Sequence, residues 1–223
     1  MPAGAAAAPG SGAGWARRAV PGRAAAVAVA VLLSLVAACG TGRGMPAEGT
    51  VHRTTAQPVA ALRAAAALEP CPAPGGSAPT GSGSLLPDLT LQCLGDGDPV
   101  ALRRLAGTPT VLTLWASWCA PCRQELPAFQ RLHVDAGRAV RVLGVVTEDP
   151  VGSALSLAAG TGVHFPSVVD DTGRLKRALG RSLLPTTVLV RADGGIAQVY
   201  TGPPLHDDTL RRLVRDRLGV TVR

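Results

Sequence analysis

The chain has 223 residues, which is enough for one domain with extensions or for two small domains. Hydrophobic residues make up 47% and charged residues 17%, which excludes a wholly disordered polyelectrolyte, although 27 glycines and 19 prolines predict loose stretches. The net charge of +7 comes almost entirely from arginines spread along the chain. Because no basic stripe is interleaved with aromatic residues, the composition argues against nucleic-acid binding.

Residues 1–38 have the pattern of a signal peptide. Three arginines and no acid are followed by an apolar run from Ala24 to Ala38, whose length of about 15 residues is short for a membrane-spanning helix. The run ends in Leu-Val-Ala-Ala-Cys, which resembles the bacterial lipobox. This resemblance implies that Cys39 is acylated and tethers the mature protein to the extracytoplasmic face of a bacterial cell membrane. The alternative is an ordinary secretory signal.

Residues 39–84 are rich in Gly, Pro and Ala and are predicted to form a lipid-anchored flexible linker, in which a short Ala-rich helix between Val59 and Leu68 stays unassigned. The compact domain is predicted to span 85–223. Strands are expected at 89–91, 110–115, 140–146, 187–190 and 196–200, with a short unassigned segment at 165–169. Helices are expected at 122–133, 152–159, 172–179 and after a cap at Asp207 or Asp208. This alternation predicts an α/β fold with a mixed sheet covered by helices on both faces.

The strand at 110–115 leads directly to Cys119-Ala120-Pro121-Cys122, at the start of a predicted helix. Free N–H groups at a helix N-terminus stabilise a thiolate, so Cys119 is the expected nucleophile, and Pro121 suits a first turn that needs no N–H from it. Cys122 would then resolve a mixed disulfide between Cys119 and a substrate. Half of a zinc site and an inert disulfide are the alternatives for such a pair.

Residues 114–127, Leu184-Pro185-Thr186-Thr187 and the turn Asp193-Gly194-Gly195 together resemble the TlpA/ResA-like extracytoplasmic thiol-disulfide oxidoreductases of the thioredoxin superfamily, over about 85–218. The resemblance implies a thioredoxin-like fold with Cys119 and Cys122 as its redox-active disulfide. It also implies that Pro185 is a cis-proline facing the cysteines, and that Leu184 and Trp118 bind substrate. Without the Cys-Ala-Pro-Cys motif earlier in the chain, Pro185 would be interpreted as an ordinary trans proline in a turn before a strand.

Glu125 lies one helical turn beyond Cys122, on nearly the same face. The family resemblance implies that this glutamate handles protons for the buried thiol, and the alternative is a solvated acid on the helix surface. The chain departs from thioredoxins themselves, which carry an acid six residues before the first cysteine, because Thr113 stands there.

Cys71 and Cys93 remain once Cys39 and the redox pair are assigned, and an oxidising compartment favours a structural disulfide between them. A second redox pair is the alternative.

The resemblance implies thiol-disulfide exchange on exported proteins, as oxidative folding or as reduction of apocytochrome c-type thiols, with a membrane redox partner that resets the cysteines and with no cofactor or metal. Ala120 and Pro121 leave the direction of exchange open. The competing hypothesis is a copper chaperone that uses Cys119, Cys122 and a histidine such as His164 or His206. A peroxidase is disfavoured because Ala116 replaces the threonine usual in that chemistry.

Overall fold

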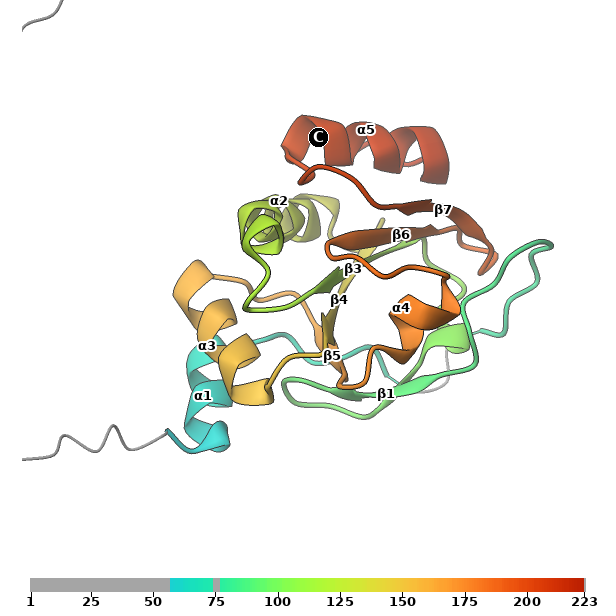
Figure 1. Ribbon diagram of the computed structural model, residues 1–223. Helices are drawn as coiled ribbons and strands as arrows, with labels where there is room; N and C mark the ends of the chain where they lie inside the picture. Colours follow the sequence, from blue (N-terminus) through green and yellow to red (C-terminus); the bar gives the residue numbers. More distant parts are fainter. Residues whose placement is uncertain (1–56, 74–76, 223) are drawn as a thin grey trace, which may run out of the picture. The chain divides into compact units, whose positions relative to one another are not determined.

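The centre of the fold is a seven-stranded mixed sheet, seen in the computed structural model, which describes residues 57–73 and 77–222 (Figure 1). Its strands are β1 (Thr90–Cys93), β2 (Val100–Ala101), β3 (Thr110–Trp115), β4 (Arg141–Thr147), β5 (Ser167–Asp170), β6 (Thr186–Val190) and β7 (Ile196–Tyr200). They lie in the order β2-β1-β5-β4-β3-β6-β7. β3 pairs parallel with β4 and antiparallel with β6. The predicted α/β fold with a mixed sheet is confirmed.

Helices cover both faces of this sheet, and every residue of β3 is buried between them. The helices are α1 (Val59–Ala66), α2 (Ala120–Ala136), α3 (Val151–Thr161), α4 (Arg174–Ala178), α5 (Asp207–Leu218) and the 3-10 turn η1 (Leu102–Arg104). On one face Trp115 packs with residues of α1, α2, α3 and α5, and on the other Leu112 packs with η1 and α4. None of these helices, within the part of the chain that the structure describes, is long and apolar enough to cross a membrane.

The predicted elements from β1 to α5 agree with the structure to within a few residues. Three elements escaped prediction: β5, which overlaps the unassigned segment at 165–169, and β2 and η1, in which two and three residues are too few to show a periodicity. The start of α5 also differs. Its N-cap is His206, while Asp207 and Asp208 lie inside the first turn, where their charges complement the helix dipole.

Residues 57–73 pack on the domain and are not part of a flexible linker, which corrects the domain boundary placed at residue 85. α1 lies beside α3 (Figure 1), with Ala66 fully buried in the core. The Arg63 Nε donates to the Leu94 carbonyl at 3.0 Å, and the Glu69 N–H donates to the carbonyl of His164 at 2.7 Å. Small alanines let α1 approach closely without the large apolar residues on which the prediction relied. The predicted signal peptide, Cys39 and the first part of the linker lie outside the described residues.

A disulfide between Cys71 and Cys93 attaches this N-terminal segment to β1, across a sequence separation of 22 residues. Both cysteines are largely buried, in the same cluster as the η1 and α4 contacts. The disulfide therefore closes a loop that begins in the segment predicted to be a linker and ends in β1.

The double variant Cys71→Ser/Cys93→Ser is expected to lose about 3 kcal/mol of unfolding free energy, because opening a loop of this length restores chain entropy to the unfolded state. Guanidinium unfolding of the oxidised protein, without reductant, measures this loss. An unchanged transition midpoint would contradict a structural role for the bridge.

Candidate active site

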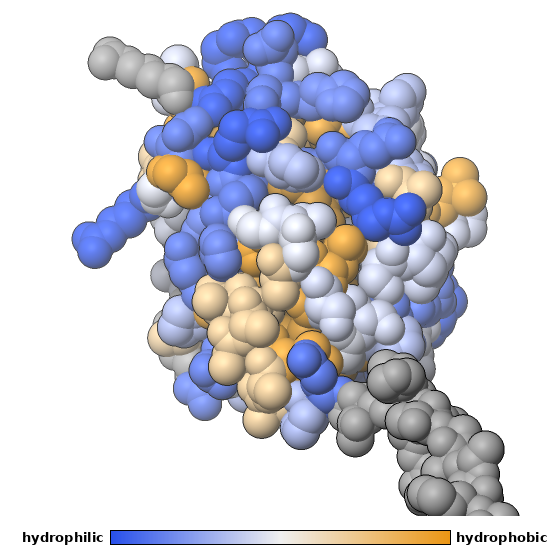
Figure 2. All heavy atoms as spheres, turned by 90° about the vertical axis from the view of Figure 1, so that its left-hand side faces the viewer, coloured by the Kyte–Doolittle hydropathy of each residue, from blue (hydrophilic) through white to orange (hydrophobic). Residues whose placement is uncertain are grey.

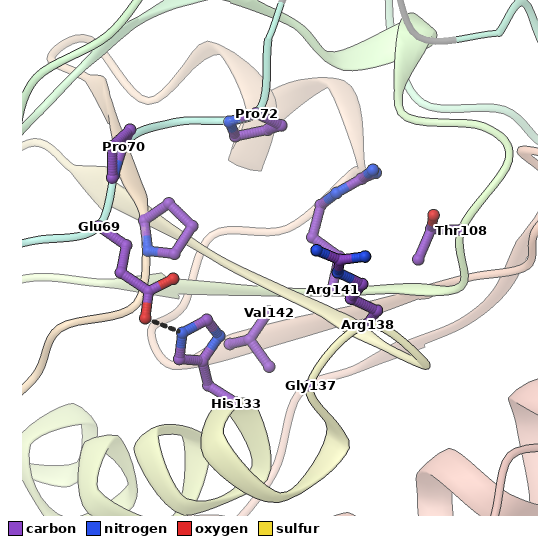
Figure 3. A pocket seen from close by; sticks show the side chains of 10 residues that line it. Glu69, Pro70, Pro72, Thr108, His133, Gly137, Arg138, Arg141 and Val142 are labelled. Atoms are coloured by element: carbon purple, nitrogen blue, oxygen red, sulfur yellow. Dashed lines mark hydrogen bonds and ion pairs between the residues drawn. The ribbon is translucent and has the colours of Figure 1, made fainter.

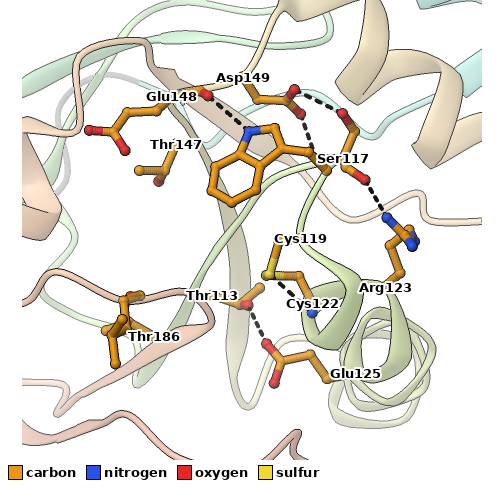
Figure 4. The surroundings of a disulfide bond; sticks show 12 residues. Thr113, Ser117, Cys119, Cys122, Arg123, Glu125, Thr147, Glu148, Asp149 and Thr186 are labelled. Atoms are coloured by element: carbon orange, nitrogen blue, oxygen red, sulfur yellow. Dashed lines mark hydrogen bonds between the residues drawn. A yellow bond between two sulfur atoms is a disulfide. The ribbon is translucent and has the colours of Figure 1, made fainter.

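Cys119 and Cys122, the predicted redox pair, lie where β3 leads into α2 (Figure 4). Cys119 is the N-cap of α2, and its Sγ accepts a hydrogen bond from the Cys122 N–H at 3.3 Å. The two cysteines form a disulfide, with Cys119 4% exposed and Cys122 fully buried. A backbone donor already directed at the Cys119 sulfur is the arrangement that stabilises a thiolate there.

Glu125 lies beneath the pair and is 1% exposed, so it is not a solvated surface acid. Its Oε1 accepts a hydrogen bond from the Thr113 hydroxyl of β3 at 3.2 Å (Figure 4). Its Oε2 accepts one from the Leu205 N–H, also at 3.2 Å. Burial raises the pKa of Glu125 to about 7, and the two hydrogen bonds oppose this rise. The carboxyl therefore has a pKa near neutral pH and lies one helical turn from Cys122.

The turn before Cys119 is held by the Asp149 carboxylate and the Glu148 backbone carbonyl, two partners that sequence reasoning missed. The Ser117 N–H and hydroxyl donate to the two carboxylate oxygens of Asp149, at 2.6 and 2.8 Å, and the Trp118 indole N–H donates to the Glu148 carbonyl at 3.1 Å (Figure 4). Glu148 and Asp149 follow β4, which is the parallel neighbour of β3. Because neighbouring parallel strands end at the same sheet edge, the position of these acids after a predicted strand was the signal that could have found them.

Glu148 is fixed in turn by Lys176, the only lysine of the chain. The Lys176 Nζ donates to the Glu148 Oε2 at 2.6 Å, and this lysine is 9% exposed. Glu148 also has a φ of 53°, a left-handed conformation uncommon for a residue with a Cβ. The ion pair secures the backbone that receives the Trp118 indole.

The predicted substrate-binding residues gather at the same end of the sheet. The Leu184–Pro185 peptide bond is cis. β6 begins immediately after it, and its first residue, Thr186, is the register partner of Leu114 near the end of β3. Leu184 is half-buried against both core clusters, whereas Trp118 is 57% exposed. Pro185 therefore lies near the strand end from which the chain runs on to Cys119.

The histidines named for the copper hypothesis have other surroundings. The His164 Nδ1 lies 3.1 Å from the carbonyl oxygen of Ala66, in the N-terminal segment, and His206 is the N-cap residue of α5. Over residues 57–73 and 77–222, no group of three or more His, Cys, Asp or Glu side chains is placed to hold a metal ion.

A pocket of about 340 Å³ lies at the other end of α2 (Figure 3). Its lining includes Arg138 and Arg141 and the pair formed by Glu69 and His133, whose side chains meet at 2.8 Å. None of the predicted site residues lines it, so it is separate from the redox centre.

A disulfide at a helix N-terminus, in a thioredoxin-like sheet and above a buried carboxyl, defines the class of protein: a thiol-disulfide oxidoreductase. Residues 81–214 match the Redoxin family model, and the chain belongs to this family, as a ResA/TlpA-like member of the thioredoxin superfamily.

Known relatives agree with this class. The thiol-disulfide oxidoreductase ResA of Geobacillus kaustophilus is 32% identical over 132 residues, which cover 59% of this chain and 75% of the relative. A secreted Mycobacterium tuberculosis disulfide oxidoreductase matches with a TM-score of 0.53 and 27% identity, over 58% of this chain and 96% of that one. An exposed lipoprotein thioredoxin of Streptococcus pneumoniae matches with a TM-score of 0.51 and 25% identity, over 58% and 99%.

Proposed function

We propose that Cys119 and Cys122 carry out thiol-disulfide exchange on exported proteins, with Cys119 as the nucleophile and Cys122 as the resolving thiol. The observation that carries this proposal is the placement of the pair: Cys119 caps α2 and receives the Cys122 N–H, while Cys122 is fully buried. In the reduced protein the Cys119 thiolate attacks a substrate disulfide and releases one substrate thiolate. Cys122 then attacks the Cys119 sulfur, re-forms the internal disulfide and releases the second substrate sulfur.

Glu125 accepts the proton that Cys122 releases in the second step. Cys122 must lose its proton before it attacks, and the ionised Glu125 carboxyl is a base placed one helical turn away in the same buried region. In the reverse direction, an attacking substrate thiolate displaces Cys122 as a thiolate, and protonated Glu125 returns the proton. Its pKa of about 7 keeps both protonation states accessible at neutral pH.

Leu184, Pro185 and Trp118 form the substrate-binding surface in this proposal. An extended substrate segment would pair with the Leu184 backbone and contact the exposed Trp118 ring. The substrates would be exported proteins with cysteine thiols or disulfides, including apocytochromes c, and a membrane redox partner would reset the pair after each cycle.

The proposal is tested by equilibrating the full chain in glutathione redox buffers while tryptophan fluorescence is recorded. Trp115 shares the core cluster of the redox pair and Trp118 adjoins Cys119, so we expect one two-electron transition. The midpoint would also assign the direction of exchange. The transition should persist in Cys71→Ser/Cys93→Ser and vanish in Cys119→Ser/Cys122→Ser. The opposite pattern would move the redox function to the Cys71–Cys93 bridge.

We further propose that acylation of Cys39 anchors the protein to the outer face of the cell membrane. The support is the lipobox-like sequence and the likeness to the exposed lipoprotein thioredoxin of Streptococcus pneumoniae. Two acyl chains give stable membrane attachment. In a bacterial host, Cys39→Ala should therefore move the protein from the membrane to the soluble fraction, as judged by fractionation and immunoblotting. Unchanged membrane association would overturn the proposal.

A further inference from the structure

The carboxyl group of Glu125 is bound by two uncharged donors from different parts of the chain. The Thr113 hydroxyl from β3 reaches one oxygen and the Leu205 N–H, from the segment before α5, reaches the other. Thr113 and Leu205 are both fully buried. Each oxygen thus has a donor, one a side-chain hydroxyl on a buried strand and the other the backbone N–H of a buried residue in the loop before α5.

No charged side chain shares this environment. Among the described residues Glu125 forms no ion pair, the Arg123 guanidinium of α2 donates to the Ser117 carbonyl, and Cys119 and Cys122 are joined in a disulfide. On the segment entering α5, His206 is exposed and Asp207 pairs with Arg131 at 2.7 Å. On the face of Thr113, β6 and β7 present Thr187 and Tyr200, and the Tyr200 hydroxyl donates to the Pro203 carbonyl. Neutral hydrogen bonds are therefore what opposes the cost of burying the charge of this acid.

The hydroxyl of Thr113 differs from the Leu205 N–H in one chemical respect. An N–H can only donate, and it favours the ionised carboxylate. A hydroxyl can donate to the ionised carboxylate and can also rotate to accept the proton of the neutral acid. Thr113 can therefore keep its contact with Glu125 through both halves of the exchange cycle, which an apolar residue at this position could not do.

We propose that Thr113 is a positioning residue that sets the proton affinity of Glu125 and holds its carboxyl toward the redox pair in both protonation states. This inference rests on the proposed role of Glu125 in exchange. Thr113 stands six residues before Cys119, where thioredoxins carry an acid, and in this chain the threonine at that position would act through Glu125.

The neighbouring strand provides a matched control. Thr187 of β6 is the register partner of Thr113, and opposite residues of an antiparallel pair point to the same face. Thr187 is 1% exposed, and its hydroxyl is buried without a hydrogen-bond partner. Thr113→Val and Thr187→Val therefore remove the same atom from adjacent buried positions, but only the first removes a bond to Glu125.

The test is the pH titration of the Glu125 side-chain carboxyl in the oxidised full chain, followed by ¹³C NMR and assigned with Glu125→Gln. A lost hydrogen bond to a charged acceptor corresponds to about a tenfold rise in proton affinity, so Thr113→Val should raise the midpoint by about one pH unit. Thr113→Ser, which keeps the hydroxyl, and Thr187→Val should titrate close to wild type. If Thr113→Val does not fold, Thr113→Ala takes its place under the same criterion.

A Thr113→Val midpoint equal to wild type, or an equal shift in Thr187→Val, would overturn the inference. The carboxyl titration requires no substrate, so it is independent of the exchange mechanism. The role of Glu125 fails separately if Glu125→Gln leaves the pH profile of exchange unchanged.

Discussion

The Cys122→Ser protein is expected to accumulate mixed disulfides with its substrates, whereas Cys119→Ser should trap almost none, and both should lose turnover to the background level. Cys119 is the attacking sulfur in the proposed mechanism, and it stays reactive when Cys122 is replaced. The resolving attack is then missing, so the intermediate persists. Without Cys119, the remaining Cys122 is fully buried and cannot reach a substrate.

Trapping is measured by non-reducing electrophoresis after the reduced variants are mixed with a model protein disulfide, and the adducts should disappear on addition of dithiothreitol. The Cys71→Ser/Cys93→Ser variant serves as the control, because it leaves the redox pair intact and should turn over substrate without trapping it. Adducts formed by Cys119→Ser, and not by Cys122→Ser, would reverse the assigned roles of the two cysteines.

The sheet was predictable because its strands are strongly patterned. β3 is a continuous apolar run buried on both faces, and its predicted bounds of 110–115 are those in the structure. The same holds for β7 at 196–200, which follows an Asp-Gly-Gly turn. Periodicity and turn residues carry this information locally, so no knowledge of the packing was required.

The N-terminal segment was not predictable in this way. Its helix, α1, presents mostly alanines, and an isolated helix of eight residues is marginal in water. Its stability comes from tertiary contacts, among them the Arg63 bond to Leu94 and the bridge from Cys71 to Cys93. Proline and glycine content alone could not distinguish this packed segment from a linker.

The candidate site was likewise predictable only where its residues are close together in the sequence. The cysteines and Glu125 follow one another on a single helix, so their spacing alone indicated a shared region. The partners of Glu125 come from β3 and from a segment 80 residues further along, and Asp149 comes from the end of β4. Such contacts depend on strand order and register, which the local sequence does not encode.

Burial of Glu125 also predicts a large pH effect on stability. The pKa of the Glu125 carboxyl is about 7 in the folded protein, against 4.5 as the ordinary value. As the pH rises between these values, the unfolded chain releases this proton first, so each unit of pH favours unfolding. Below about pH 4.5 the carboxyl is neutral in both the folded and the unfolded chain, so burial of a charge does not lower the free energy of unfolding. Above about pH 7 the full cost of a buried charge applies, which is on the order of 3 kcal/mol.

Replacing Glu125 with Gln removes this titration while keeping the shape of the neutral acid. The free energy of unfolding of Glu125→Gln should therefore equal that of wild type near pH 4.5 and exceed it by about 3 kcal/mol at pH 8. Urea unfolding of both proteins at these two pH values, with both disulfides oxidised, measures the difference, and other titrating groups cancel because the proteins share them. A difference that does not change with pH would mean that the Glu125 carboxyl titrates alike in the folded and unfolded chains, and its proposed exchange of protons at neutral pH would lose its physical basis.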